Sequence, residues 1–279
     1  IFYNQTYMII DTFLYFNEKE LADLRIKYLK DEVDLFVIIE ANITHQGKPK
    51  EWNFEKILNT KLLPFKNKIK YHKLIIEEKD IQKNEGWISE NVKGGKSWKI
   101  ENIQRNFIQT ACKNFSKEDI ILISDVDEIP SLKKIKFLRK CEFDEINPVA
   151  FEQFLFHTNC EYLNLEKWIG TIATKNKIIQ KFKPQDLRNN RWRVSMLAQA
   201  GWSFSSFGSL EKIREKFEAF AHSEYNNDQF KSDEHINNCL KNGSDLFKRN
   251  IKKKKIEKNF FPDDLLAIME NNKKFYFIN

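Results

Sequence analysis

Three carboxylates that end an apolar run in the middle of the chain are the residues with the clearest capacity for chemistry. Residues 120–123 are aliphatic, and Asp125, Asp127 and Glu128 follow them closely. Hard carboxylate oxygens at this spacing suit Mg²⁺ or Mn²⁺, and such a metal commonly takes phosphate oxygens as further ligands. The motif therefore predicts a metal–diphosphate site. The alternative is a surface turn whose acids cap a helix.

The elements that must position these acids can be predicted from the hydrophobic pattern. Residues 120–123 and 35–39 are continuous apolar runs, which are typical of strands buried on both faces. A shorter run over 7–10 ends at Asp11, and the second strand ends at Glu40. Strands that alternate with helices predict an α/β fold with a mostly parallel sheet, whose ligands gather at the carboxyl ends of the strands.

Further elements are expected around this sheet. Apolar residues at helical spacing predict a helix over about 100–111, which carries Arg105. Residues 149–157 form a predicted strand in which Glu152 is the only charge, and a helix is expected to begin near Leu210. The polar stretch 77–96 has no clear period, so we expect a long loop that could close over a ligand.

The composition limits the class of partner. The 279 residues carry a formal net charge of +7, which favours an anionic partner. Much of this charge lies in residues 248–258, where a solvated helix face and contact with an anionic membrane are the two interpretations. No nucleic-acid recognition module accompanies the charge, so nucleic acid is not expected as a partner. The four widely spaced cysteines predict neither a zinc site nor a redox motif.

Four segments, in order along the chain, resemble glycosyltransferase family 17. They are Ile10-Asp11-Thr12-Phe13-Leu14-Tyr15-Phe16-Asn17-Glu18, Glu40-Ala41-Asn42 with Gly47-Lys48-Pro49, Ser124-Asp125-Val126-Asp127-Glu128-Ile129-Pro130, and Gly201-Trp202-Ser203-Phe204. The likeness extends from about residue 8 to about residue 230. The resemblance implies a GT-A type fold, a nucleotide-sugar donor such as UDP-GlcNAc, a divalent metal (Mn²⁺ or Mg²⁺), inversion at the anomeric carbon and a glycan acceptor.

A single domain over 1–279 is expected, with a donor half over about 1–130, an acceptor half over about 131–245 and a basic tail over about 246–279. Residue roles follow from the resemblance together with the expected chemistry. Asp125 and Asp127 are the expected metal ligands, with Asp125 also at the donor and His222 a candidate to complete the metal shell. The other candidates are Asp11 and Glu40 for nucleoside hydroxyls, Lys48 and Arg105 for phosphates, Trp202 and Phe204 for the acceptor, and Glu152 or Glu211, then Glu224, for the general base.

Two other classes of protein compete with this interpretation. One is a glycan-binding module that keeps the fold without catalysis, and the other is a phosphatase of the haloacid dehalogenase type, which expects its D-x-D motif on the first strand. No membrane-spanning stretch or signal peptide is visible in the sequence. The expected location is the cytoplasm or a membrane surface for a bacterial or viral protein, and the Golgi lumen for a eukaryotic one.

Overall fold

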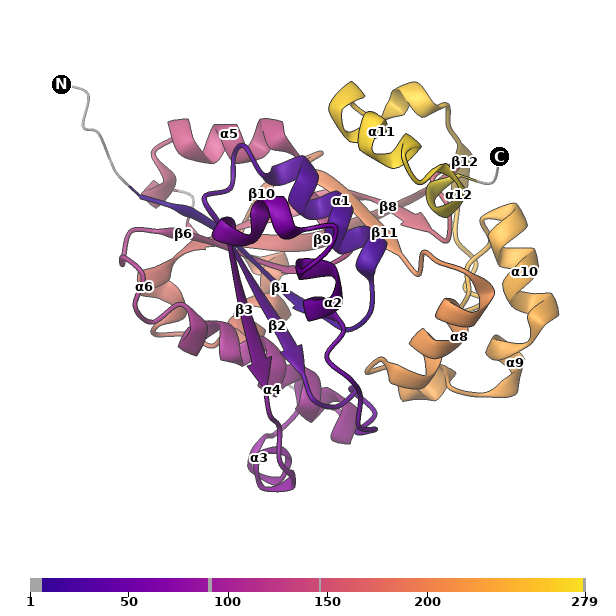
Figure 1. Cartoon of the computed structure of the whole chain (residues 1–279), viewed down its shortest axis with the longest axis horizontal. Helices are drawn as coiled ribbons and strands as arrows, with labels where there is room; N and C mark the ends of the chain where they lie inside the picture. The colour runs from indigo at the N-terminus through magenta and orange to yellow at the C-terminus, as the bar shows by residue number, and fades with distance from the viewer. Residues whose placement is uncertain (1–6, 90–91, 146, 278–279) are drawn as a thin grey trace.

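The computed structural model describes residues 7–89, 92–145 and 147–277. Its centre is a ten-stranded sheet, of which the main path has the order β3-β2-β1-β6-β9-β8-β11-β7 (Figure 1). The strands of this path are β1 (Ile9–Tyr15), β2 (Leu35–Ala41), β3 (Ile69–Leu74), β6 (Ile120–Asp125), β7 (Glu128–Pro130), β8 (Val149–His157), β9 (Tyr162–Lys175) and β11 (Gly201–Ser205). Two short strands lie off the path, β10 (Ser195–Leu197) beside β8 and β12 (Lys253–Lys255) beside β9.

Most neighbouring strands at the start of the sheet are parallel. β3, β2, β1 and β6 run in one direction, with Ile10 opposite Leu35 and Ile121. β9 is antiparallel to both β6 and β8, whereas β11 is parallel to β8 and β7 is antiparallel to β11. The prediction of an α/β fold with a mostly parallel sheet is therefore confirmed.

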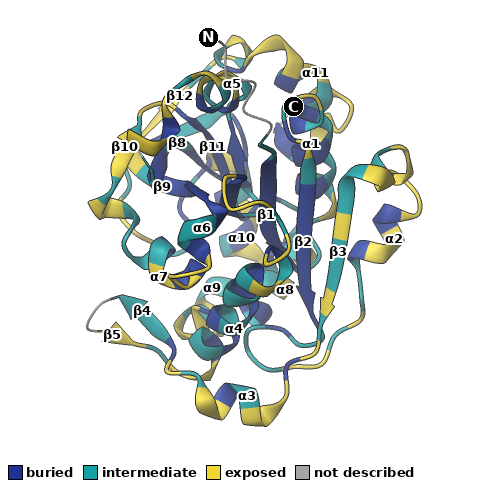
Figure 2. Ribbon diagram, turned by 90° about the vertical axis from the view of Figure 1, so that its left-hand side faces the viewer, coloured by how far each residue is buried: buried dark blue, intermediate teal, exposed yellow. Residues whose placement is uncertain are grey.

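Helices cover both faces of the sheet, because alternate residues of its central strands point to opposite sides. Ile9 and Phe13 of β1 face a large core that includes α1 (Lys19–Leu29), α2 (Phe54–Leu58), α5 (Leu132–Lys140) and α11 (Asp263–Glu270). Ile10 and Leu14 face α4 (Lys96–Ala111) in a second core. Figure 2 shows β1 and almost all of β2 buried between these layers.

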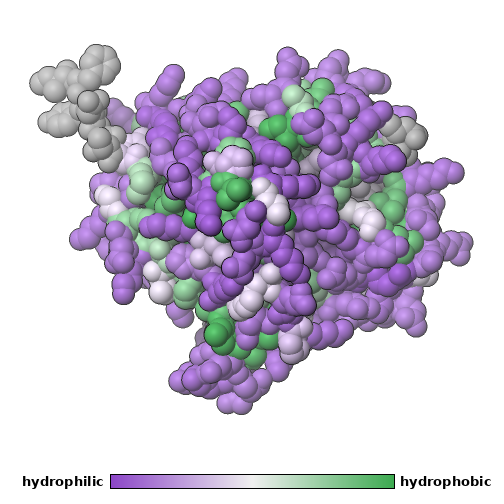
Figure 3. Space-filling model, in the orientation of Figure 1, coloured by the Kyte–Doolittle hydropathy of each residue, from purple (hydrophilic) through white to green (hydrophobic). Residues whose placement is uncertain are grey.

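A third cluster joins the helices that follow β11. Ile213 and Phe217 of α8 (Leu210–Ala219) pack with Ile236 and Cys239 of α10 (Asp233–Asn242), next to α9 (Asp228–Lys231). The remaining helices are short: α3 (Glu78–Lys83), α6 (Asn176–Ile179), α7 (Pro184–Asn189) and α12 (Lys273–Tyr276). The surface drawn in Figure 3 is mainly hydrophilic, and its hydrophobic residues are scattered. Among the described helices, none is long and apolar enough to cross a membrane.

Several sequence predictions about elements need correction. β1 continues to Tyr15 and β2 to Ala41, so Asp11 and Glu40 lie inside strands and not after them. The stretch 77–96 is not a featureless loop, because it forms α3, the hairpin strands β4 (Trp87–Ser89) and β5 (Val92–Lys93), and the start of α4. The longest strand, β9, was not predicted, because its exposed first half mixes polar and apolar residues.

The C-terminal residues pack against the sheet. Phe261, Leu265 and Tyr276 belong to the large core, where α11 lies against α1. Residues 253–255 form strand β12 with three exposed lysines, so the interpretation of the basic cluster as a helix face is wrong. Contact between these lysines and an anionic membrane stays a prediction.

Candidate active site

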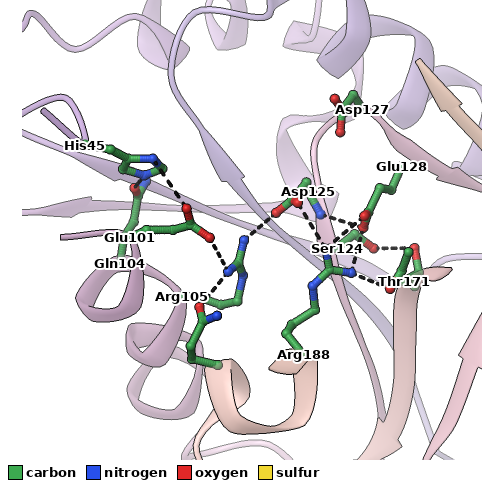
Figure 4. Close-up of polar contacts among 12 residues, drawn as sticks. His45, Glu101, Gln104, Arg105, Ser124, Asp125, Asp127, Glu128, Thr171 and Arg188 are labelled. Carbon is green, nitrogen blue, oxygen red and sulfur yellow. Dashed lines mark hydrogen bonds and ion pairs between the residues drawn. The ribbon is translucent and has the colours of Figure 1, made fainter. Parts of the chain in front are cut away.

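Asp125 is held on both sides by arginines from two different helices. Arg105 of α4 donates to Asp125 Oδ1 at 2.6 Å, and Arg188 of α7 donates to Oδ2 at 3.0 Å (Figure 4). Burial alone would raise the pKa of Asp125, but the two guanidinium groups outweigh burial and hold this pKa below its usual value. Asp125 is therefore ionised and already paired within the protein.

Glu128 extends the same network beneath Asp125. Its side chain is fully buried and accepts hydrogen bonds from Arg188 Nη1 (2.9 Å) and Nη2 (2.8 Å), from Trp168 Nε1 (3.1 Å) and from the backbone N–H of Asp125 (3.0 Å). Gly170 of β9 lies against it, since a Cβ at this position would be 3.0 Å from Glu128 Cδ. Arg188 and Glu128 thus fix the end of β6.

Asp127 lies in a different environment, although it is only two residues from Asp125. Figure 4 shows its carboxylate apart from the hydrogen-bonded network. Among the described residues, its nearest cation is Lys216 of α8, with Nζ 3.9 Å from Oδ2, and the Asp127 side chain is only 19% exposed. Burial raises the pKa of Asp127 to about 7, with Asp125, Glu128 and Glu18 adding to the rise and Lys216 opposing it. This carboxyl group is therefore partly protonated near neutral pH, unlike that of Asp125.

The backbone around Asp127 is held by a buried arginine of α1. Arg25 is fully buried and binds Asp11 through Nε and Nη2, both at 2.6 Å. Its Nη1 donates to the carbonyl oxygens of Asp125 (3.1 Å) and Glu128. On the other side, β7 pairs with β11, where a Cβ on Gly201 would be 2.1 Å from the carbonyl oxygen of Ile129. The turn that carries Asp127 is thus fixed at both ends.

Two adjoining cavities lie beside Asp127. The large cavity, about 80 Å³, is at the carboxyl ends of β1 and β2 and is closed by α4 and α8. The small cavity, about 20 Å³, contains Asp127 itself. Glu18 and Lys216 line both. The large cavity is lined by Tyr15, Phe16, Glu18, Ala41, Ile43, Thr44, His45, Lys50, Gln104, Lys216, Ala219 and Phe220.

A chain of polar contacts joins the large cavity to Asp125. His45 Nε2 lies 3.0 Å from Gln104 Oε1, and its Nδ1 lies 3.9 Å from a carboxylate oxygen of Glu101. Glu101 in turn accepts a hydrogen bond from Arg105 at 2.7 Å, and Arg105 binds Asp125. Side chains of α4 therefore connect the acid motif to the large cavity through hydrogen bonds and ion pairs (Figure 4).

Asp11 and Glu40, which were expected to bind nucleoside hydroxyls, instead bind other groups of the protein. Asp11 is fully buried in its pair with Arg25. Glu40 is also fully buried and accepts from Lys50, from Tyr71 Oη at 2.6 Å and from the backbone N–H groups of residues 53 and 54. Because β1 and β2 are longer than expected, both acids lie inside the sheet and present no free oxygen to the cavity.

Neither of the two residues expected to bind phosphate, Arg105 and Lys48, lines one of the two cavities. Arg105 is almost fully buried, and its guanidinium is occupied by Asp125, Glu101 and Gln185. Arg105 therefore binds carboxylates of the protein itself, since α4 turns it toward the acid motif. Lys48 is exposed on the loop after β2 and lies outside the lining of both cavities.

His222 does not lie with the two aspartates. Its Nδ1 is 2.8 Å from a carboxylate oxygen of Glu224, and its ring packs edge-on against Trp98 at 4.8 Å. Both His222 and Glu224 are largely exposed. Within the described part of the chain, no group of three or more His, Cys, Asp or Glu residues is arranged to hold a metal ion. Of the two expected metal-binding carboxylates, Asp125 is paired with two arginines, whereas Asp127 has no hydrogen-bond donor at its carboxylate among the described residues.

The expected acceptor residues lie in the core. Trp202 is 6% exposed and packs against Tyr28, while Phe204 is fully buried against Phe207 and Phe261. The C-terminal segment, expected to be a tail, folds back and covers this aromatic face. Trp202 and Phe204 therefore have no surface on which a sugar could stack.

The two carboxylates expected as general base lie outside both cavities. Glu152 of β8 forms an ion pair with Lys167 at 2.8 Å, with 18% of its side chain exposed. Glu211 is fully exposed in the first turn of α8, where a hydrogen bond with Ser209 lowers its pKa. These positions reflect the alternation of side chains along β8 and the N-cap of α8 at Ser209.

Four important residues were not identified from the sequence. Arg188, Arg25 and Lys216 have no motif of their own, and each reaches the acids only through the fold. Glu18 ends the first of the four segments that resemble the family, but its position beside Asp127 also depends on the fold. Arg188 lies in a stretch rich in arginines, which was the one available signal. Lys216 is one of several lysines on α8 and carries no such signal.

Comparison with known protein families gives a match over most of the chain. The profile of "Glycosyltransferase family 17" matches residues 2–255. The chain therefore belongs to this glycosyltransferase family, which sets aside the phosphatase alternative. The predicted family is confirmed.

Individual relatives are distant. The β-1,4-mannosyl-glycoprotein 4-β-N-acetylglucosaminyltransferases of human and rat are each 26% identical over 129 residues, which is 44% of this chain and 22% of each enzyme. The matched segment thus spans about a fifth of these relatives. Solved structures that match in part include 4-diphosphocytidyl-2C-methyl-D-erythritol synthase of Anaerococcus prevotii (TM-score 0.40, 8% identity, 68% of this chain and 87% of that chain) and the bifunctional glycosyltransferase WbbM (0.35, 12%, 71% and 39%).

Proposed function

We propose that this chain transfers a sugar from a nucleoside diphosphate donor, UDP-GlcNAc, to a hydroxyl group of a glycan, with inversion at the anomeric carbon. The observation that carries the proposal is the position of Asp127. Its carboxylate lies in the small cavity, next to a large cavity at the carboxyl ends of parallel strands. Ligands of open α/β sheets bind at this edge.

The proposed donor site uses the large cavity for the nucleoside. Tyr15, Phe16 and Phe220 supply aromatic surface, and His45 and Thr44 supply polar groups. A mostly apolar lining with a few polar groups suits a small organic ligand. The diphosphate would then extend from the large cavity toward Asp127, because the two cavities share Glu18 and Lys216.

The residues present fit a divalent metal at Asp127. Mg²⁺ is commonly bound by one or two carboxylates, with substrate phosphates and water completing its shell, so one free carboxylate is enough. Asp125 would not need to be a direct ligand, since Arg105 and Arg188 already neutralise it. When bound, Mn²⁺ or Mg²⁺ would stabilise the charge that develops on the leaving diphosphate. The same arginines hold Asp125 and Glu128 in place and so orient the turn for the donor.

The name of the human relative supports N-acetylglucosamine as the transferred sugar. The experiment that tests the proposal measures release of UDP from UDP-GlcNAc with Mn²⁺, with and without a panel of free glycans. We expect slow hydrolysis that an acceptor glycan accelerates. A protein that binds glycans but releases no UDP from any nucleotide sugar would instead be the non-catalytic binding module.

A further inference from the structure

A diphosphate that extends from the large cavity needs a positively charged partner, and few cations there are free. This inference rests on the proposed function. Lys50 lines the large cavity, but its ammonium group is buried against Glu40. Arg105 and Arg188 lie deeper and are paired with Asp125. Lys216 is the remaining cation of the large cavity in the described part of the chain.

Lys216 has a suitable position between the two cavities. It lines both of them, its side chain is 32% exposed, and its Nζ is 3.9 Å from Asp127 Oδ2, which is longer than a hydrogen bond. Lys212, one turn earlier on the same helix, is instead engaged by the carbonyl oxygen of Asn17 at 3.1 Å and by Glu20 at 3.2 Å. Within the described ranges, Lys216 thus has Asp127 at 3.9 Å and no hydrogen-bond partner for its ammonium group, whereas Lys212 has two.

The fold fixes the helix that carries Lys216. Ile213 and Phe217 anchor α8 in the third hydrophobic cluster. At the end of α8, Gln46 donates through Nε2 to the carbonyl oxygens of Phe217 (2.9 Å) and Phe220 (3.2 Å). Gln46 lies on the loop after β2, next to His45 of the large cavity. α8 is thus tied to the same loop that borders the cavity, and Lys216 is held at their junction.

We propose that Lys216 binds the diphosphate of the donor, exchanging its long contact with Asp127 for a phosphate oxygen. In the free protein, the ammonium group of Lys216 lies 3.9 Å from Asp127 Oδ2 and partly offsets the charge of that carboxylate. A metal ion at Asp127 would take over that role, and the flexible lysine stem would let the ammonium group turn to the phosphates. A charge-assisted hydrogen bond to phosphate is among the stronger contacts in proteins.

The test compares Lys216→Met with the wild type in calorimetric titrations of UDP with Mn²⁺, and in ligand-observed NMR titrations of uridine, which lacks phosphate. We expect Lys216→Met to weaken UDP binding by about tenfold or more, the usual effect of losing a hydrogen bond to a charged group. Uridine binding should stay within about twofold, since uridine has no phosphate to meet the ammonium group. Arg214→Met is the matched control, because Arg214 lies on the same helix but pairs with Asp233 on the outside. The control should bind UDP like the wild type.

Two results would overturn the proposal while leaving the proposed function intact. One is UDP binding by Lys216→Met within twofold of the wild type. The other is an equal loss of UDP and uridine binding, which would mean that Lys216 shapes the cavity and does not contact phosphate. A wild-type protein that binds none of the nucleoside diphosphates UDP, GDP, CDP and ADP would overturn the proposed function itself, and the role of Lys216 with it.

Discussion

Asp125 and Asp127 belong to one short motif, yet their surroundings are opposite. Asp125 is bound by two arginines and its pKa is lowered, whereas Asp127 has a lysine at 3.9 Å and a pKa raised to about 7. A strand end followed by a tight turn sends the two side chains in different directions (Figure 4). The first acid is therefore part of the protein's own structure, and the second is available to a ligand.

The difference between Asp125 and Asp127 shows that a buried carboxylate can either stabilise the fold or remain available for binding. A carboxylate inside a complete network is rigid and stable, but it has no capacity left for binding. A carboxylate left without a close partner is unfavourable in the free protein, and binding a cation relieves that cost. The network of Arg105, Arg188 and Glu128 thus acts as the support on which Asp127 is presented.

Removing the paired acid should give the largest effect on stability. Asp125→Ala removes the carboxylate that Arg105 and Arg188 share, while Glu101 and Glu128 still pair with them, so we expect a loss of about 1.5–3 kcal/mol in the free energy of unfolding. Chemical denaturation measures this loss. The double variant Arg105→Met with Asp125→Ala should lose less than the sum of the two single variants, because the charges are coupled. Additive losses would show that the pair does not interact.

Removing the free acid should affect activity and spare the fold. Asp127→Asn keeps the size of the side chain but removes its charge, so we expect sugar transfer to fall by at least about a hundredfold, as for other lost electrostatic contacts to a transition state. UDP binding with Mn²⁺ should fall as well. The control is Asp186→Asn, a substitution outside the lining of both cavities. Undiminished transfer by Asp127→Asn would exclude Asp127 as a metal ligand.

The raised pKa of Asp127 predicts a pH-dependent difference in stability. The carboxyl group holds its proton up to about pH 7 in the folded protein, but only to about pH 4 when unfolded. Stability from this group is therefore lost as the pH rises from about 4 to about 7. Without metal, Asp127→Asn should be more thermostable than the wild type by a few degrees at pH 8, and this advantage should vanish near pH 4.

Thermal unfolding in EDTA at pH 4, 6 and 8 checks this prediction. The difference between the variant and the wild type isolates Asp127 from other titrating groups such as His157, whose pKa burial lowers to about 4. An unchanged difference at all three pH values would mean that Asp127 is ionised throughout this range.

The sequence predicted the parts of the site that depend on neighbours along the chain. A continuous apolar run that ends in acids predicted β6 and its carboxylates, because both features are local. Arg25, Arg188 and Lys216 could not be predicted in the same way, since they reach the acids from α1, α7 and α8. Charge alone does not identify them among 47 lysines and arginines.

The errors at strand ends have a related cause. Asp11 and Glu40 interrupt apolar runs and therefore suggested strand exits, but both strands continue past them. A buried acid is compatible with a strand interior when a partner such as Arg25 or Lys50 reaches it. Those partners lie 14 and 10 residues away in the chain. Only the three-dimensional arrangement distinguishes a paired internal acid from an acid that faces a ligand.

The smallest effects are expected at the two carboxylates that lie away from the cavities. Glu211→Gln and Glu152→Gln should each leave transfer within about twofold, because Glu211 is fully exposed and Glu152 pairs with Lys167. The measurements are the steady-state kcat of glycan transfer and the affinity for the donor, each compared with the wild type. A general base behaves differently, since its loss lowers kcat strongly while donor affinity is retained. A low kcat with unchanged donor affinity in Glu152→Gln would mean that the acceptor approaches along β8. The comparison between Asp125 and Asp127 would then describe only the donor side of the site.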